Sequence, residues 1–142
     1  RAGIFGQFSD FEGFFEGVYQ HFATAEPWVV YQDTLISLQR WQRMNIPLGI
    51  ISNFDSRIYA VLDALDLRQY FQTITISTEA GAAKPDSLIF TTALQKHNCS
   101  PSDAWHVGDS RKDDLKGAQG VGLRGILLKR PDQPNVQSPL LP

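Results

Sequence analysis

The chain contains the stretch His106-Val107-Gly108-Asp109-Ser110-Arg111-Lys112-Asp113-Asp114, in which an apolar strand runs into Gly-Asp and two more carboxylates follow four and five residues after Asp109. Hard oxygen donors at the carboxyl end of a strand suit Mg²⁺, which takes one or two protein carboxylates and fills its other positions with water and substrate phosphate. The stretch therefore predicts a divalent-cation site. The simpler alternative is an acidic turn in which Asp109 or Ser110 caps a helix.

A second apolar run, Leu48-Gly49-Ile50-Ile51-Ser52-Asn53, ends in a hydroxyl and an amide and leads through Phe54-Asp55-Ser56-Arg57 into a helical pattern. This order predicts a strand, a loop and a helix. A serine hydroxyl and backbone N–H groups at the start of a helix can hold phosphate oxygens, so Ser52 and Asn53 are candidate phosphate ligands. Taken alone, the run is better explained by ordinary capping. Arg57 could reach a substrate or pair with Asp55.

A third segment, Ala83-Lys84-Pro85-Asp86, places a lysine at a predicted loop tip. Pro85 fixes the backbone, and Asp86 can cap a helix that begins near Ser87. A fixed ammonium group balances nearby carboxylates and steadies a phosphoryl group. Lys84 is therefore a candidate catalytic and phosphate-binding cation, although a lone surface lysine would simply be solvated.

Taken together and in this order, the three segments resemble the second, third and fourth motifs of the haloacid dehalogenase (HAD) superfamily of phosphatases and related hydrolases. The likeness runs from about residue 33 to 128. The residues around the three motifs (SNFDSR, GAAKPD, HVGDS) are most similar to those of HAD-like hydrolase domain-containing proteins with a small helical cap. It implies Ser52 as the phosphate-binding hydroxyl, Lys84 as the family's lysine and Asp109 as a ligand of Mg²⁺. It also implies that Asp113 or Asp114 supports the metal and the lysine. The family uses either spacing, so this choice stays open.

The family's chemistry needs a nucleophilic aspartate in a DxDx[TV] motif at the end of the first strand, and the chain contains no such motif. The second aspartate of that motif, the family's general acid/base, is missing with it. Because the chain opens at Arg1 and not at Met, we expect an N-terminally truncated fragment that lacks the first strand and the early cap. Without an aspartate to phosphorylate, the fragment should bind but not turn over.

Apolar patterns alternate between strands and helices along the chain. Strands are expected near residues 47–51, 73–77, 104–107 and 125–128, and helices after Asp33, Ser56 and Ser87 and through Leu115. The alternation predicts an α/β three-layer sandwich with a Rossmann-like parallel sheet between helices. The family resemblance implies the sheet order 5-4-1-2-3. The missing first strand would then leave two bare interior edges, through which the fragment could self-associate.

We divide the chain into a remnant of the helical cap, residues 1–30, a HAD-like core, residues 31–130, and a proline-rich tail, residues 131–142. Ser9-Asp10-Phe11-Glu12 is a capping-box pattern, and an aromatic stripe follows it at helical spacing. We expect this stripe to pack the cap against the core. Four prolines among the last twelve residues are typical of a disordered or loosely attached tail.

Composition narrows the class of protein. With 142 residues, of which 42% are hydrophobic, the chain can form one sizeable core. The net charge of −2 provides no basic field for nucleic acid. Cys99 is the only cysteine, which excludes an intrachain disulfide and a cysteine-based zinc site. No apolar stretch approaches the length of a membrane span. We therefore expect a cytoplasmic protein without nucleic-acid or membrane partners.

The three histidines are weak candidates for a catalytic base. His21 and His97 are expected at helix ends, where solvation or the helix dipole explains them. His106 is expected to be packed and hydrogen-bonded in its strand, or, as a sharper alternative, to support the metal ligands.

The leading hypothesis is a full-length parent that is a Mg²⁺-dependent phosphatase of a small phosphorylated metabolite, acting through an aspartyl-phosphate. One alternative is a metal-independent dehalogenase of the same superfamily, against which the Gly108-Asp109 pair argues. A further alternative is a non-catalytic binding module of the same fold that pairs with another chain.

Overall fold

The computed structural model describes residues 10–130 of the chain, and strands and helices alternate along them. The helices are α1 (Phe11–His21), α2 (Gln32–Arg43), α3 (Arg57–Ala64), α4 (Ser77–Ala80), α5 (Ser87–His97) and α6 (Gly117–Gly120). The strands are β1 (Gly49–Ser52), β2 (Thr73–Ile76), β3 (Trp105–Gly108) and β4 (Arg124–Leu127). Two 3₁₀ turns, η1 (Arg68–Tyr70) and η2 (Pro101–Asp103), and one π-helical turn, η3 (Arg111–Lys116), complete the order.

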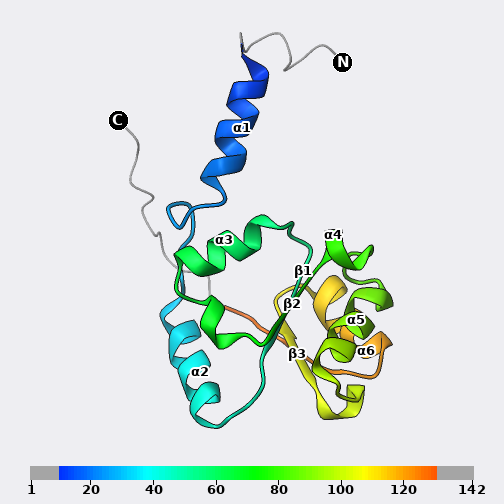
Figure 1. The fold of residues 1–142 in the computed structure, drawn as a ribbon. Coiled ribbons are helices and arrows are strands. Elements are labelled where there is room, and N and C mark those ends of the chain that lie inside the picture. The colour runs from blue at the N-terminus through cyan, green and yellow to red at the C-terminus, as the bar shows by residue number, and fades with distance from the viewer. Residues whose placement is uncertain (1–9, 131–142) are drawn as a thin grey trace.

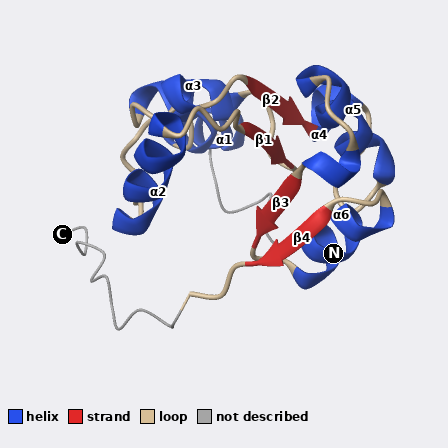
Figure 2. Ribbon diagram, turned by 90° about the horizontal axis from the view of Figure 1, so that it is seen from below, coloured by secondary structure: helices blue, strands red, loops and turns tan. Residues whose placement is uncertain are grey.

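The four strands of the described region form two separate parallel pairs. β1 pairs with β2, and β3 pairs with β4. The two pairs lie next to each other, with β1 and β3 as the neighbouring strands, and each of these two has one unpaired edge (Figure 2). This arrangement agrees with the expected sheet order, in which a further strand would lie between β1 and β3.

Helices cover the strands from two sides, so the expected three-layer α/β architecture is confirmed (Figure 1). Alternate residues of β1 enter different cores, since Ile50 packs in the cluster on the side of α2 and α3, and Ile51 in the cluster on the side of α5 and α6. The buried members of the first cluster are Leu38, Leu62, Leu67, Ile74 and Ile76. Those of the second are Ile89, Phe90, Leu94, Ala118 and Leu123.

One face of the β3–β4 pair is left open by the described residues. Trp105 and Val107 of β3 are 60% and 46% exposed, and Ile126 of β4 is 39% exposed. Val107 lies beside Ile126 in the parallel register, so these side chains share one face. Apolar area of this kind is normally covered in a folded core.

Two helix starts differ from the sequence-based prediction. The N-cap of α1 is Asp10, whose carboxylate accepts a hydrogen bond from the Gly13 N–H at 2.8 Å, and Ser9 lies outside the described residues. The helix expected to follow Asp33 begins one residue before it, because α2 starts at Gln32, so Asp33 lies inside the helix and is not its cap. Asp33 instead pairs with Arg130 at 2.6 Å. A carboxylate in the first turn still interacts favourably with the helix dipole.

Helix α1 extends away from the core and buries none of its residues (Figure 1). The expected packing of its aromatic stripe is therefore confirmed only in part. Phe15 is 59% exposed, whereas the Tyr19 ring lies 4.1 Å from the Arg57 guanidinium. Phe22 contacts Trp28, which in turn contacts Phe54 of the loop after β1. The expected proline-rich tail, residues 131–142, lies outside the described residues.

Within residues 10–130, no helix combines the length and the apolar character that a bilayer span requires.

Candidate phosphate and metal site

Three loops meet at the carboxyl ends of β1 and β3, and the first contact between them is made by Asn53. Its Oδ1 accepts a hydrogen bond from the Lys84 backbone N–H at 2.7 Å, and its Nδ2 donates to the Lys84 carbonyl at 3.0 Å. The Asn53 side chain thus bonds both the N–H and the C=O of Lys84, as the backbone of a neighbouring β-strand would. The structure therefore commits the Asn53 side chain to positioning Lys84, and a phosphate contact from this amide stays a prediction.

Ser52 ends β1, and its Oγ accepts a hydrogen bond from the Phe54 N–H at 3.1 Å. This is the ordinary capping contact, the simpler of the two roles predicted for Ser52. The Ser52 hydroxyl donates no hydrogen bond to any described residue, however, and a hydroxyl that accepts one bond can still donate its proton. The geometry is compatible with capping and with phosphate binding at once.

Lys84 ends in a buried ion pair with Asp114. Its Nζ lies 2.6 Å from Oδ1 of Asp114, and the two side chains are 14% and 5% exposed. His106 Nε2 lies 2.9 Å from the same oxygen, and the Ser110 N–H donates to Oδ2 at 2.9 Å. Asp114 is therefore the centre of a hydrogen-bonded network that joins β3, its loop and the lysine loop.

The network shifts the pKa values of Asp114 and of His106. Burial raises the pKa of Asp114, but the hydrogen bonds from Lys84, His106 and Ser110, with the Lys84 charge, outweigh burial and lower that pKa to about 2. Burial lowers the pKa of His106, and it outweighs the opposing attraction of Asp114. The arrangement therefore favours an ionised Asp114 beside a neutral His106.

The stability of the fold should fall in acid because of Asp114. Its pKa is about 2 in the folded chain, against about 3.9 for an unfolded aspartate, so it stabilises the fold above about pH 4 and this contribution disappears as the pH falls toward 2. At roughly 1.4 kcal/mol per pKa unit the loss is about 2 to 3 kcal/mol. Urea unfolding at several pH values between these limits measures it. The Asp114→Asn variant should lack this part of the slope; equal slopes in both proteins would contradict the assignment.

Gly108 makes the position of Asp114 possible. A Cβ atom at residue 108 would lie 2.2 Å from Asp114 Cγ, far inside van der Waals contact. The glycine of the Gly-Asp pair therefore leaves the space into which the carboxylate folds back over the end of β3.

The three acids of the motif separate into different roles. Asp114 holds Lys84, whereas Asp113 contacts Ser110, whose hydroxyl donates to the Asp113 carboxylate at 3.1 Å and accepts from the Asp113 N–H. Ser110 is thus the cap of η3, one of the two caps that the sequence allowed. Asp109 is exposed at the strand end, and its carboxylate has no hydrogen bond or ion pair with the described residues.

The donor set suits Mg²⁺ only in part. No three acidic, histidine or cysteine side chains within residues 10–130 come together as a metal cage. Of the acids at positions 109, 113 and 114, Asp109 is the one whose carboxylate has no hydrogen bond or ion pair with the described residues. One such carboxylate meets the minimum for Mg²⁺, an ion that usually keeps several waters and uses phosphate oxygens. Further protein ligands would have to come from outside the described residues.

Arg57 pairs with Asp55, one of the two alternatives that its position left open. The guanidinium donates to both carboxylate oxygens, with the shortest contacts at 2.7 and 2.8 Å. These hydrogen bonds lower the pKa of Asp55. Because the guanidinium also lies over Tyr19 of α1, this pair joins the helix to the loop after β1.

Two hydrogen bonds in the structure, one made by His97 and one by Asn53, were not predicted from the sequence. His97, expected at a helix end, also bonds through Nε2 to the Thr73 hydroxyl at 2.7 Å and fills the space above Gly49. The link from Asn53 to the Lys84 backbone spans 31 residues of sequence, and no local pattern signals it.

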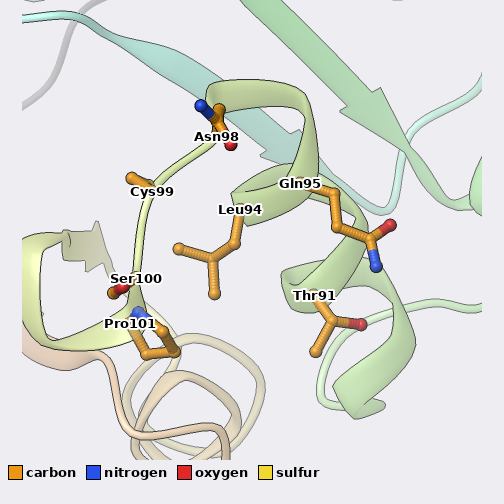
Figure 3. A pocket seen from close by; sticks show the side chains of 7 residues that line it. All are labelled: Thr91, Leu94, Gln95, Asn98, Cys99, Ser100 and Pro101. Atoms are coloured by element: carbon orange, nitrogen blue, oxygen red, sulfur yellow. The ribbon is translucent and has the colours of Figure 1, made fainter.

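A pocket of about 400 Å³ lies away from these loops, between α5 and the segment that precedes β3 (Figure 3). Its lining residues are Thr91, Leu94, Gln95, Asn98, Cys99, Ser100 and Pro101. None of them is charged, and the pocket lies toward the amino end of β3, whereas ligands of parallel sheets bind at the carboxyl ends. It is therefore not the candidate phosphate site.

Comparison with known proteins agrees with the fold and the motifs. Residues 5–122 match the family of haloacid dehalogenase-like hydrolases. The chain is 33% identical over 117 residues to haloacid dehalogenase-like hydrolase domain-containing protein 3 of Bos taurus, which covers 82% of this chain and 47% of that protein. It is 33% identical over 97 residues to ribulose-1,5-bisphosphate 5-phosphatase of Halopiger xanaduensis, with 68% of this chain and 41% of that protein covered.

Two solved structures have the same fold. The HAD phosphatase of Thermococcus onnurineus superposes with a TM-score of 0.75 at 24% identity and covers 87% of this chain and 56% of its own. The 2-haloacid dehalogenase of Pseudomonas syringae pv. Tomato superposes with a TM-score of 0.65 at 29% identity, over 80% of this chain and 47% of its own. The chain belongs to the haloacid dehalogenase-like hydrolase family. It spans about half the length of the curated relatives it matches.

Proposed function

We propose that the chain is the phosphate- and metal-binding half of a Mg²⁺-dependent phosphatase that acts on a small phosphomonoester. One observation carries this proposal: Lys84 is held by Asn53 and Asp114 at the carboxyl ends of β1 and β3, where Ser52 also lies. A cation fixed beside a hydroxyl suits a phosphoryl group. The name of the Halopiger relative, a phosphatase of a sugar bisphosphate, supports the same class of substrate.

Each side chain has a separate task in this proposal. Ser52 donates its hydroxyl proton to a phosphoryl oxygen, and Lys84 offsets the charge that develops on the phosphoryl group. Asp114 keeps the ammonium group in place. Asp109 holds Mg²⁺, which, when bound, neutralises charge on the phosphoryl oxygens and orients them.

The nucleophile is assigned to a DxDx[TV] strand of the same protein that lies upstream of this chain. Asp114 is committed to Lys84, and Asp113 contacts the cap of η3, so neither acid is free to attack. The upstream strand would fill the space between the unpaired edges of β1 and β3 and satisfy their backbone groups. An in-frame DxDx[TV] segment in the upstream coding sequence is the simplest test of this part.

A metal-independent dehalogenase is the second candidate, supported by the likeness to the Pseudomonas dehalogenase. The two candidates differ in what Asp109 does. A phosphatase needs its free carboxylate for the metal, and a dehalogenase has no metal to hold.

Substitution of Asp109 tests the metal assignment in the extended protein, in which the upstream strand and cap precede this chain. Asp109→Asn should lower the Mg²⁺ affinity about tenfold or more, measured by calorimetry, because the amide is a weaker and uncharged ligand. Asp103→Asn is the matched control, since that exposed acid lies in η2 ahead of β3. An unchanged affinity would remove Asp109 from the site. Halide release from a 2-haloacid without Mg²⁺ would favour the dehalogenase.

A further inference from the structure

His106 is partly buried in β3, beside the ion pair that holds the candidate phosphate site together. Its side chain is 11% exposed, and its Nε2 lies 2.9 Å from the Asp114 oxygen that also binds Lys84. The Phe90 ring and the imidazole form a T-shaped pair with a centroid distance of 5.2 Å and an interplanar angle of 86°. An apolar side chain would pack equally well against Phe90, so packing alone does not explain a histidine here.

The donors around Asp114 come from two different parts of the chain. His106 and Ser110 belong to β3 and its own loop, and they bind Oδ1 and Oδ2 respectively. Lys84 comes from a loop 30 residues away and shares Oδ1 with the histidine. Two local donors on different oxygens fix the orientation of a carboxylate, because rotation would break one of the two bonds.

We propose that His106 is a positioning residue for Lys84. By donating from Nε2 it fixes Asp114 Oδ1, and the fixed carboxylate sets where the Lys84 ammonium group meets the phosphate. Without this donor, Oδ1 would be bound by Lys84 alone, and carboxylate and lysine could shift together away from the phosphate. The inference rests on the proposed function, since it assumes that Lys84 binds phosphate.

Three replacements of His106 separate this role from simple packing. The amide nitrogen of glutamine is as many bonds from Cβ as Nε2 of histidine, whereas that of asparagine is one bond shorter. His106→Gln should therefore keep the hydrogen bond to Asp114. His106→Asn and His106→Leu should lose it. Each variant of the 142-residue chain is titrated with inorganic phosphate in the presence of Mg²⁺, and the amide resonances of Ser52, Asn53 and Lys84 report binding.

The Asn and Leu variants should bind phosphate about tenfold more weakly than the unsubstituted chain. The Gln variant should bind it with nearly the affinity of the unsubstituted chain. His97→Asn is the control, because it removes a partly buried histidine hydrogen bond to Thr73 away from these loops. It should lower the melting temperature and leave phosphate affinity unchanged. Unchanged phosphate affinity in the Asn and Leu variants would overturn the positioning role of His106 and leave the proposed function standing. Absence of phosphate binding by the unsubstituted chain would overturn the proposed function, and the inference with it.

A second measurement needs no variant and so does not depend on how the variants fold. The ¹⁵N chemical shifts of the His106 ring in the unsubstituted chain should show a proton on Nε2, the nitrogen that faces Asp114. A ring with its only proton on Nδ1 could not donate to Asp114, and this result would overturn the inference.

Discussion

The purified chain of 142 residues should hydrolyse no phosphomonoester, even with Mg²⁺ and a reactive aryl phosphate as substrate. We expect this because the sequence contains no DxDx[TV] motif. Asp114 is buried and bound to Lys84, Asp113 contacts Ser110, and Asp109 is the metal ligand of the proposed function. A carboxylate that attacked from the loop after β3 would not be in line with the leaving group, so the covalent step would lack its geometry.

Release of phosphate by the chain, compared with the extended protein at equal concentration, measures this loss. A synthetic peptide with the upstream DxDx[TV] strand is the complementary measurement. It should raise the melting temperature of the chain, because it pairs with the bare edges of β1 and β3, and it could restore traces of turnover. Robust Mg²⁺-dependent hydrolysis by the chain alone, free of contaminating phosphatase, would contradict the predicted inactivity. It would also require a nucleophile within the chain.

The bare edges also bear on the state of the chain in solution. Strand edges in the middle of a sheet expose unpaired N–H and C=O groups, and the open face beside them carries Trp105, Val107 and Ile126. We therefore propose that the isolated chain self-associates. The complementing peptide should compete with this association, because both would use the same edges.

The alternation of strands and helices was predictable because it rests on local periodicity. All four strands fall within about two residues of the predicted positions, and Asp86 caps α5 as expected, with its carboxylate accepting the Leu88 N–H. Helix starts were less certain, as Asp33 shows. A carboxylate two residues after the N-cap looks the same in sequence as a carboxylate at the cap.

The roles of Asp113 and Asp114 could not be read from the sequence. The choice depends on the turn that follows Ser110, which is π-helical and not α-helical: the Leu115 N–H reaches the Ser110 carbonyl at 3.1 Å, five residues back. Such a turn rotates each following side chain relative to an α-helix. It turns Asp114 inward toward Lys84 and His106, and this geometry is set by tertiary packing and by the space at Gly108.

Replacement of Ser52 or Lys84 by alanine should lower the phosphatase activity of the extended protein by roughly two orders of magnitude. Each change removes a charge-assisted contact that is strongest when charge builds on the transferred phosphoryl group. The fall should appear in kcat as well as in kcat/KM. Lys112→Ala is the matched control, because Lys112 is an exposed lysine of the neighbouring turn η3.

The two variants should differ in stability, and this difference separates phosphate binding from a role in the fold. Ser52→Ala removes one capping contact with Phe54, so its melting temperature should change little. Lys84→Ala leaves the buried Asp114 carboxylate without its charged partner, which costs on the order of 3 kcal/mol. Activity must therefore be counted per folded molecule. If melting falls in both variants while activity per folded molecule holds, Ser52 and Lys84 serve only the fold, and the phosphate site must be sought elsewhere.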